Sequence, residues 1–290
     1  MNLGTIKNKK SIRNFWYSLS PDRRYFLRKL FFWPLDTFEK LIGKRHKYVP
    51  PRGAVFTGGT AGAIKFIEEA AHQLSLLKTY THVATDHCVL DIGCGVGRTA
   101  IALTDHLSSE GSYKGFDPVE KGINWCKKGI ASDYPNFEFT HVDLFNDLYK
   151  NKGDDAAAFK FPYRDNQFDV CFSFSVFTHM SVKEIQNYLH EIYRVSKVGA
   201  INLSTFFIYN AQNEEYISTR DSFSFPVKRD NYRLMHEDVT AGNIAIEESF
   251  LLKMIANAGF KETKIIHGFW KDKKYTGDKL EYQDIVVFMK

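Results

Sequence analysis

The first residues that could do chemistry form a glycine-rich run, Val89-Leu90-Asp91-Ile92-Gly93-Cys94-Gly95-Val96-Gly97-Arg98. The mostly apolar residues 88–92 predict a strand, and the glycines predict a tight turn that lets the backbone approach a ligand closely. A helix after the turn would offer unpaired N–H groups to the same ligand. The carboxylate of Asp91 would repel a pyrophosphate and attract an ammonium group. A glycine turn that only forms a corner of the fold is the alternative interpretation.

The spacing of these glycines separates two kinds of nucleotide-binding turn. Dinucleotide-binding enzymes use G-x-G-x-x-G, in which the third glycine would stand where this chain has Arg98. The spacing here is G-x-G-x-G. The sequence therefore disfavours a dinucleotide oxidoreductase.

Two further acids follow the next two predicted strands. Asp117, beside Pro118, lies 20 residues after Gly97, and a carboxylate there can accept hydrogen bonds from both ribose hydroxyls. Asp143 follows the third strand, where it can accept from an adenine amino group while Leu144 packs against the ring. Because the carboxyl ends of parallel strands meet at one edge of a sheet, these acids and Asp91 together predict a nucleoside-containing ligand. Ordinary loop acids are the alternative.

Strands and helices alternate along the chain, which is typical of an α/β fold with a doubly wound, mostly parallel sheet. Ser181 and Glu184 have the spacing of a capping box, which predicts the start of a helix. The last two strands have no helix between them and predict an antiparallel hairpin. Residues 210–245 fit no core element, and we expect them to cover the substrate at the carboxyl edge of the sheet. The predicted strands are residues 88–92, 112–116, 137–140, 168–174, 200–207, 262–269 and 282–289, and the predicted helices are residues 63–77, 119–132, 181–193 and 247–258.

Residues 60–290 resemble the class I, Rossmann-like, S-adenosylmethionine-dependent methyltransferases of the small-molecule type. The resemblance implies S-adenosylmethionine as cofactor and a seven-stranded sheet of order 3-2-1-4-5-7-6 with strand 7 antiparallel. It also implies that the glycine turn surrounds the methionine portion, with Asp117 on the ribose and Asp143 on the adenine. The cofactor-binding residues predicted on this basis are Asp91, Gly93, Cys94, Gly95, Gly97, Arg98, Asp117, Pro118, Asp143, Leu144, Ser173, Phe174, Ser175 and Val176.

Several other chemistries lack their motifs in this sequence. No Asn/Asp-Pro-Pro-Tyr/Phe run follows the fourth strand, as amino-group methyltransferases of nucleobases need, and no Pro-Cys nucleophile is present. None of the four cysteines forms a CxxC pair or lies near a histidine at zinc-ligand spacing. We therefore expect no metal and reduced thiols in a cytoplasmic protein. Neither a secretory signal nor a membrane-spanning run is recognisable.

Two histidines are candidates for removing a proton from the acceptor. Methyl transfer to a nucleophile needs alignment and proton removal, and imidazole can accept a proton at neutral pH. His179 follows the fourth strand, close to where the acceptor must stand, and is the candidate base. A histidine that only hydrogen-bonds the backbone is the alternative. His236, in the predicted covering insert, is the second candidate, and a solvated loop histidine is its alternative.

Residues 1–59 differ in composition from the rest of the chain. Residues 1–52 contain 13 Lys and Arg against 3 Asp and Glu, a net charge of +10, whereas the remainder has 26 basic and 31 acidic residues, a net of −5. Ser20, Pro21 and Asp22 predict a helix start, and Pro34 should stop or kink this helix. A second short helix is expected at residues 35–42. A linker with prolines at 50 and 51 and glycines at 53, 58 and 59 then leads into the catalytic domain.

This basic, aromatic-rich extension has three candidate roles. It could cover the substrate pocket as a lid or pack on the domain, it could lie on a membrane surface as a peripheral contact at the inner face, or it could bind nucleic acid. The acidic balance of the catalytic body disfavours nucleic acid as a partner. The sequence does not determine an oligomeric state.

The function that these patterns favour is methyl transfer from S-adenosylmethionine to a small-molecule acceptor. A hydroxyl acceptor is preferred to nitrogen because the nitrogen motifs are missing and a histidine is available, and a saccharide or lipid-linked acceptor would suit the basic aromatic extension. An RNA or protein methyltransferase is the alternative among enzymes. A non-catalytic scaffold that binds the cofactor is the alternative of another class.

Overall fold

The computed structural model describes residues 21–55, 62–144, 153–237, 242–272 and 281–290. The chain folds as two compact units, residues 1–69 and residues 70–290. Gly58 and Gly59 of the predicted linker and Ser20, predicted to cap a helix, lie outside the described residues. Within the described ranges, none of the helices combines the length and the hydropathy that a membrane span requires.

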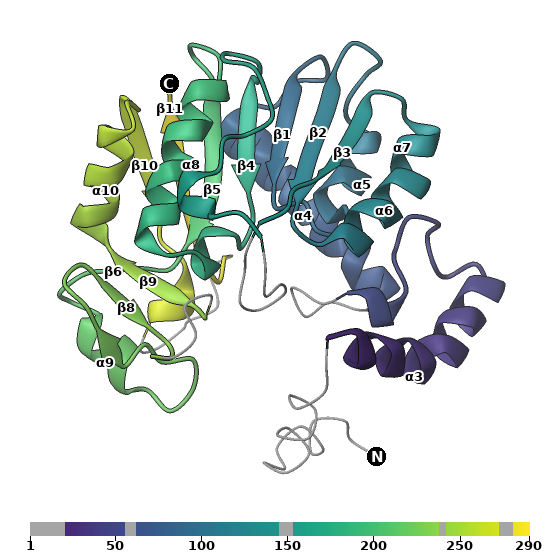
Figure 1. The fold of residues 1–290 in the computed structure, drawn as a ribbon, viewed down its shortest axis with the longest axis horizontal. Helices are drawn as coiled ribbons and strands as arrows, with labels where there is room; N and C mark the ends of the chain where they lie inside the picture. The colour runs from purple at the N-terminus through teal and green to yellow at the C-terminus, as the bar shows by residue number, and fades with distance from the viewer. Residues whose placement is uncertain (1–20, 56–61, 145–152, 238–241, 273–280) are drawn as a thin grey trace. The chain divides into compact units, whose positions relative to one another are not determined.

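The larger unit is built on one seven-stranded sheet of order β10-β11-β5-β4-β1-β2-β3 (Figure 1). Strand β11 is antiparallel to both of its neighbours, β5 and β10, and the β4, β1, β2 and β3 pairings are parallel. This is the order predicted from the sequence, with the antiparallel strand where it was expected. The strands are β1 (Cys88–Ile92), β2 (Ser112–Asp117), β3 (Phe137–His141), β4 (Val170–Ser173), β5 (Ile201–Phe206), β10 (Glu262–Ile266) and β11 (Asp284–Met289).

Helices flank the sheet because its central strands are buried on both faces. Leu90 and Ile92 of β1 belong to one apolar core together with side chains of α8 and α10. The capping box predicted at Ser181 and Glu184 is present at the start of α8. The helices after the boundary region are α4 (Ala63–Thr81), α5 (Arg98–Thr104), α6 (Glu120–Lys128), α7 (Ile130–Asp133), α8 (Val182–Val195) and α10 (Glu248–Asn257), with short 3-10 turns η2 (Ala156–Ala158), η3 (Phe177–His179) and η4 (Phe269–Lys271).

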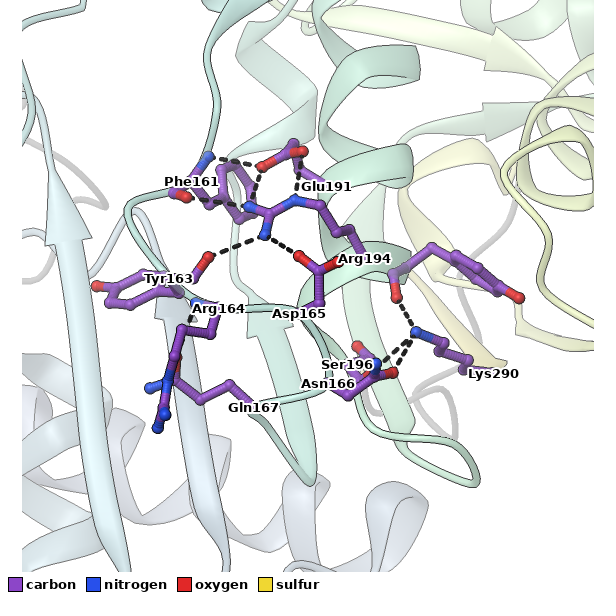
Figure 2. Close-up of polar contacts among 11 residues, drawn as sticks. Phe161, Tyr163, Arg164, Asp165, Asn166, Gln167, Glu191, Arg194, Ser196 and Lys290 are labelled. Carbon is purple, nitrogen blue, oxygen red and sulfur yellow. Dashed lines mark hydrogen bonds and ion pairs between the residues drawn. The ribbon is translucent and has the colours of Figure 1, made fainter.

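An arginine on α8 fixes the segment that leads into β4 (Figure 2). Arg194 donates hydrogen bonds to the backbone oxygens of Phe161 and Tyr163, at 3.0 and 2.9 Å, and to the carboxylates of Asp165 and Glu191. Beside it, Lys290 donates to Asn166 and to two backbone oxygens of the α8 end. These bonds hold the start of β4, so that the opposite end of this strand is presented at the carboxyl edge of the sheet.

The insert after β5 forms a second, four-stranded sheet of order β6-β9-β8-β7. Residues 210–245 were expected to fit no element of the core, and their strands lie in this separate sheet, which the sequence analysis did not foresee. The strands have only two to four residues, too few to show a hydrophobic period. The insert begins at the carboxyl edge of the main sheet, as predicted (Figure 1). Its elements are β6 (Ile208–Tyr209), α9 (Glu214–Thr219), β7 (Val227–Lys228), β8 (Tyr232–Leu234) and β9 (Ile244–Glu247).

A buried carboxylate joins the insert to the main sheet. Asp284, the first residue of β11, is fully buried and accepts hydrogen bonds from the backbone N–H of Ile208 and Gly268, at 2.7 and 2.9 Å. It also accepts from Trp270 Nε1 and Lys271 Nζ, each at 2.6 Å. Lys271 in turn donates to the backbone oxygen of Ile208. One side chain thus fixes the start of the insert and the turn before β11.

The smaller unit consists mainly of α3 (Pro21–Leu41) and the 3-10 turn η1 (Arg52–Ala54). The prediction that Pro34 divides this region into two helices was wrong, because α3 continues through Pro34. Contacts with η1 on both sides of the proline explain this. Arg28, before Pro34, donates to the backbone oxygens of residues 52 and 55, and Arg52 pairs with Asp36 and Glu39 after it.

The buried pair of Asp284 and Lys271 leads to a prediction about stability. Asp284→Ala should lower the free energy of unfolding by about 3 to 5 kcal/mol, because it leaves a buried ammonium group and three N–H donors without their acceptor. Urea denaturation followed by circular dichroism measures this change. The control is Lys228→Ala, which removes an exposed partner of Glu214 and should cost at most about 1 kcal/mol. Equal losses in the two variants would contradict the importance of the Asp284 bonds.

Candidate functional site

The turn after β1 is held against the end of β2. Gly93 N and Cys94 N both donate to the backbone oxygen of Phe116, at 2.9 and 3.1 Å. Gly93 has φ +74°, and a Cβ on it would lie 2.5 Å from Val176 Cγ2. A side chain at this position would therefore separate the turn from the β4 end.

Gly95 differs from Gly93 in what surrounds it. Its φ is +56°, and a Cβ added to it would meet no atom within 4 Å. The backbone is thus exposed to open space at the carboxyl edge of the sheet, in a conformation that L side chains rarely adopt. This is the arrangement that a ligand in close contact with the turn requires.

Asp91 is buried at the end of β1. It is 3% exposed and accepts a hydrogen bond of 2.7 Å from the hydroxyl of Tyr113. Burial raises the pKa of Asp91 to about 7, the Tyr113 bond opposes this shift, and the nearby charge of Asp117 adds to it. An ionised Asp91 would be stabilised by a cationic group in front of it.

Asp117 connects the end of β2 to the glycine turn. One carboxylate oxygen accepts from Gly95 N at 2.9 Å and the other from Val119 N at 2.8 Å. Burial raises the pKa of Asp117 to about 6, although both N–H bonds favour the ionised form. Pro118, between Asp117 and Val119 in the sequence, is partly exposed. The bond to Gly95 was not part of the sequence prediction, which assigned Asp117 to a ligand alone.

The third acid lies on the neighbouring strand end. Asp117 pairs with His141 in the β2–β3 register, and Asp143 follows two residues later with its side chain exposed. The backbone oxygen of Asp143 accepts from Asp154 N at 2.8 Å. Leu144 is buried in the main apolar core. The three predicted acids therefore lie at the ends of three adjacent strands.

The end of β4 and the segment after it are tied to β5 and to the residue before β11. Ser173 is buried and its hydroxyl donates to Ser204 at 2.9 Å. Ser175 has φ +58°, its N–H donates to Thr205 Oγ1 at 2.7 Å and its hydroxyl to Gln283 Oε1 at 2.9 Å. Phe174 and Val176 lie on either side of Ser175. These bonds hold this segment across from the glycine turn.

The remaining predicted residues of the turn are less informative. Cys94 is buried, and burial raises the pKa of its thiol well above the usual range. A thiol in this state is a poor nucleophile. Arg98 begins α5 and is half-buried.

The two candidate bases lie in different surroundings. His179 is the last residue of η3, which follows the segment after β4, and it is half-buried. Its backbone N–H donates to the backbone oxygen of Val176 at 3.0 Å. Beside it, the hydroxyl of the buried Thr178 has no hydrogen-bond partner among the described residues. His236 is exposed after β8 in the insert. Of the two histidines, His179 is the one that closely follows, in sequence, the segment that faces the glycine turn.

Sequence reasoning missed a cavity of about 610 Å³ between the insert and the turn before β11. Phe223 has φ +56°, which is a strained conformation for a bulky residue, and Arg220 Nε donates to its backbone oxygen at 2.9 Å. Tyr282 in its wall precedes Gln283, the partner of Ser175. The concentration of aromatic residues at 207–225 and 269–282 was the available signal. The lining residues are Tyr216, Thr219, Arg220, Asp221, Ser222, Phe223, Phe269, Trp270, Asp272 and Tyr282.

Part of the chain is similar to known methyltransferases. Residues 89–199 match a family model described as a methyltransferase domain. Norajmaline N-methyltransferase from Rauvolfia serpentina is 28% identical over 170 residues, which cover 58% of this chain and 52% of that protein. The chain thus spans about half the length of this curated relative.

A solved structure shows the same fold. An S-adenosylmethionine-dependent methyltransferase from Mesorhizobium loti has a TM-score of 0.51 at 12% identity, covering 77% of this chain and 100% of that chain. Another similar structure, from Methanosarcina mazei, has a TM-score of 0.48 at 21% identity, covering 74% of this chain and 96% of that chain.

Asp117→Ala tests the predicted cofactor contact. Loss of a carboxylate that accepts charge-assisted bonds should weaken S-adenosylmethionine binding by about 1.5 to 3 kcal/mol or more. Asp117→Asn, which keeps one acceptor oxygen, should lie between this variant and the wild type. Isothermal titration calorimetry measures all three. Glu110→Ala changes an exposed acid before the start of β2 and should bind normally. Normal binding by Asp117→Ala would contradict the prediction.

The raised pKa of Asp91 predicts a pH dependence. Below about pH 7 the ligand-free carboxyl is mostly protonated, so binding of an ammonium group beside it should release a proton and strengthen as the pH rises through 7. The proton release is measured by calorimetry in buffers of different ionisation enthalpy. A pH of 6.5, about half a unit below the pKa of Asp91, keeps much of this carboxyl protonated before binding. Asp91→Asn should abolish this release, whereas Asp86→Asn, an exposed acid at the other end of β1, should keep it. Equal release in both variants would exclude Asp91 as its source.

Proposed function

We propose that the chain transfers a methyl group from S-adenosylmethionine to a hydroxyl of a small organic acceptor, because residues 89–199 match a family model described as a methyltransferase domain. The observation that supports this most directly is the juxtaposition of the open backbone at Gly95 with the carboxylates of Asp91 and Asp117. The carboxylate of Asp91 would be stabilised by an ammonium group, and that of Asp117 can accept hydrogen bonds from hydroxyls. Together they suit a ligand that combines an amino acid with a nucleoside.

The residues around the turn divide the cofactor among them in this proposal. Asp91 faces the ammonium group, and Asp117 uses its remaining lone pairs for the ribose hydroxyls while it holds Gly95 and Val119. Asp143 lies toward the adenine. The methionine end lies between the glycine turn and the residues that follow β4. When bound, S-adenosylmethionine supplies a methyl group already activated on its sulfonium.

The acceptor would enter from the aromatic-walled cavity at the insert. Phe223, Phe269 and Tyr282 present ring surface there, which favours an organic molecule with apolar area. The bond between Ser175 and Gln283 links this wall to the end of β4. The strained backbone at Phe223 is of the kind that is found at ligand sites.

His179 is the proposed base. It follows the β4 segment by a single 3-10 turn, and its imidazole would take the proton of the acceptor hydroxyl as the methyl group is transferred. The other residues align the acceptor and exclude water. A nitrogen acceptor is the second candidate, because the curated relative is named an N-methyltransferase.

Substitution of His179 tests the base. His179→Ala should lower kcat by about 10²- to 10⁴-fold while the affinity for S-adenosylmethionine stays nearly unchanged. His190→Ala, which changes an exposed histidine on α8, is the matched control and should turn over normally. A rate for His179→Ala within a few-fold of wild type would make His179 structural.

The acceptor itself must be found by experiment. Extracts incubated with the protein and methyl-labelled cofactor, followed by an untargeted search for labelled small molecules, would identify it. Label in an O-methyl group supports the proposal, and label in an N-methyl group supports the second candidate. Label only in RNA or protein, or no label despite cofactor binding, would overturn the small-molecule assignment.

A further inference from the structure

Helix α3 uses its polar face inside its own unit. Asp36 and Glu39 bind Arg52, and Arg28 binds the backbone of η1. A Cβ on Gly53 would lie 2.7 Å from the backbone of Lys29, so η1 is in close contact with this face. Three charged side chains of this helix, those of Arg28, Asp36 and Glu39, therefore make their polar contacts within the unit.

The opposite face of the same helix is apolar and exposed. At 100° per residue, the exposed side chains from Trp33 round to Leu35 cover about 200° of the helix circumference. Charged residues between positions 26 and 41 fall in the remaining arc, where η1 packs. Phe31 is 65% and Phe38 58% exposed. The exposed large apolar residues of α3 and the following turn are Phe26, Leu27, Leu30, Phe31, Trp33, Leu35, Phe38, Leu41 and Ile42.

Basic residues border this apolar face. Lys29 and Lys40 are exposed and lie next to Trp33 on the helical projection, and Lys44 is exposed just beyond the helix. Long basic side chains at the edge of an apolar face can keep their charges in the headgroup region while the rings enter it. Residues 1–52 have a net charge of +10, which complements an anionic surface.

The catalytic unit offers no matching apolar surface in the part of it that the structure describes. From α4 onward, the exposed large hydrophobic residues there are Ile64, Val198, Leu252 and Tyr282, which come from four separate segments of the chain. A lid that buried nine large apolar side chains would need a complementary patch. A lipid headgroup layer needs no such shape complementarity.

We propose that α3 is a preformed docking helix that lies in the headgroup region of an anionic lipid surface, held in orientation by the contacts of Arg52. The proposal is independent of the methyl acceptor, because docking needs no turnover. It gives the apolar face a defined partner and explains why the polar face is turned inward.

Flotation of the full-length protein with vesicles tests this. Wild type should float with vesicles of phosphatidylcholine and phosphatidylglycerol, float weakly with phosphatidylcholine alone, and lose binding as salt rises. The double variant Phe31→Glu, Phe38→Glu changes two exposed side chains, so it should fold. Its vesicle partition coefficient should fall by about tenfold or more.

The matched control is Val198→Glu, Leu252→Glu, which places two acids on exposed positions of the catalytic unit. It should bind vesicles like wild type, and both double variants should keep wild-type affinity for S-adenosylmethionine. Failure of wild type to float, or unchanged flotation of the α3 variant, would overturn the proposal. A wild type that does not float, together with an α3 variant that loses methyl transfer, would assign the face to a lid.

Discussion

The carboxylate of Asp117 is the interaction on which the site depends. It accepts one N–H from the glycine turn and one from the start of α6, so three segments of the chain meet at one buried group. Without it, Gly95 would lose the acceptor of its N–H, and the left-handed conformation of the turn would lose its main constraint. The bond from Gly95 N to Asp117 holds the backbone of the turn away from the open space beside Gly95.

This arrangement costs free energy in the ligand-free protein. Asp91 and Asp117 are both buried, and burial raises their pKa values to about 7 and 6. A carboxyl whose pKa is raised on folding favours the fold most below its ordinary pKa of about 4, and that contribution disappears as the pH rises through the folded value. Near neutral pH the ligand-free fold therefore holds carboxylates that a cation and hydroxyl donors would stabilise. A binding site that is unfavourable when empty is consistent with this chemistry.

The main sheet could be predicted because each of its strands is specified by a short stretch of sequence. Each strand of the main sheet has four to six residues and is followed by a turn or helix signal, and the alternation with helices limits the topology. The glycines and the acids could be placed for the same reason, since each lies at the end of such a strand or shortly after it. The bond from Asp117 to Gly95 could not, because it joins residues 22 apart through a geometry that only the folded turn has.

The helix through Pro34, which the sequence analysis predicted wrongly, and the insert strands, which it did not foresee, share a physical cause: contacts distant in sequence outweighed local preference. Pro34 removes a hydrogen bond from α3, yet Arg28 and Arg52 hold the helix to η1 on both sides of it. The insert strands are stabilised by pairing and by the aromatic core around Phe207 and Trp270, although none is long enough to be recognised alone. Tertiary packing decided both cases.

The cofactor side and the acceptor side of the proposed site differ in the same way, since the first depends on local sequence and the second on contacts between distant segments. The cofactor side is formed by strand ends and the turns that directly follow them, and the acceptor side by contacts between distant segments, such as Ser175 with Gln283 and Asp284 with the insert. Residues on the insert surface can therefore vary without disturbing Asp117 or the glycine turn, provided that Asp284 keeps its donors. Under the proposed function, acceptor specificity can therefore change while cofactor binding is retained, because the bond between Ser175 and Gln283 joins the cavity wall to the end of β4 without involving Asp117 or the glycine turn.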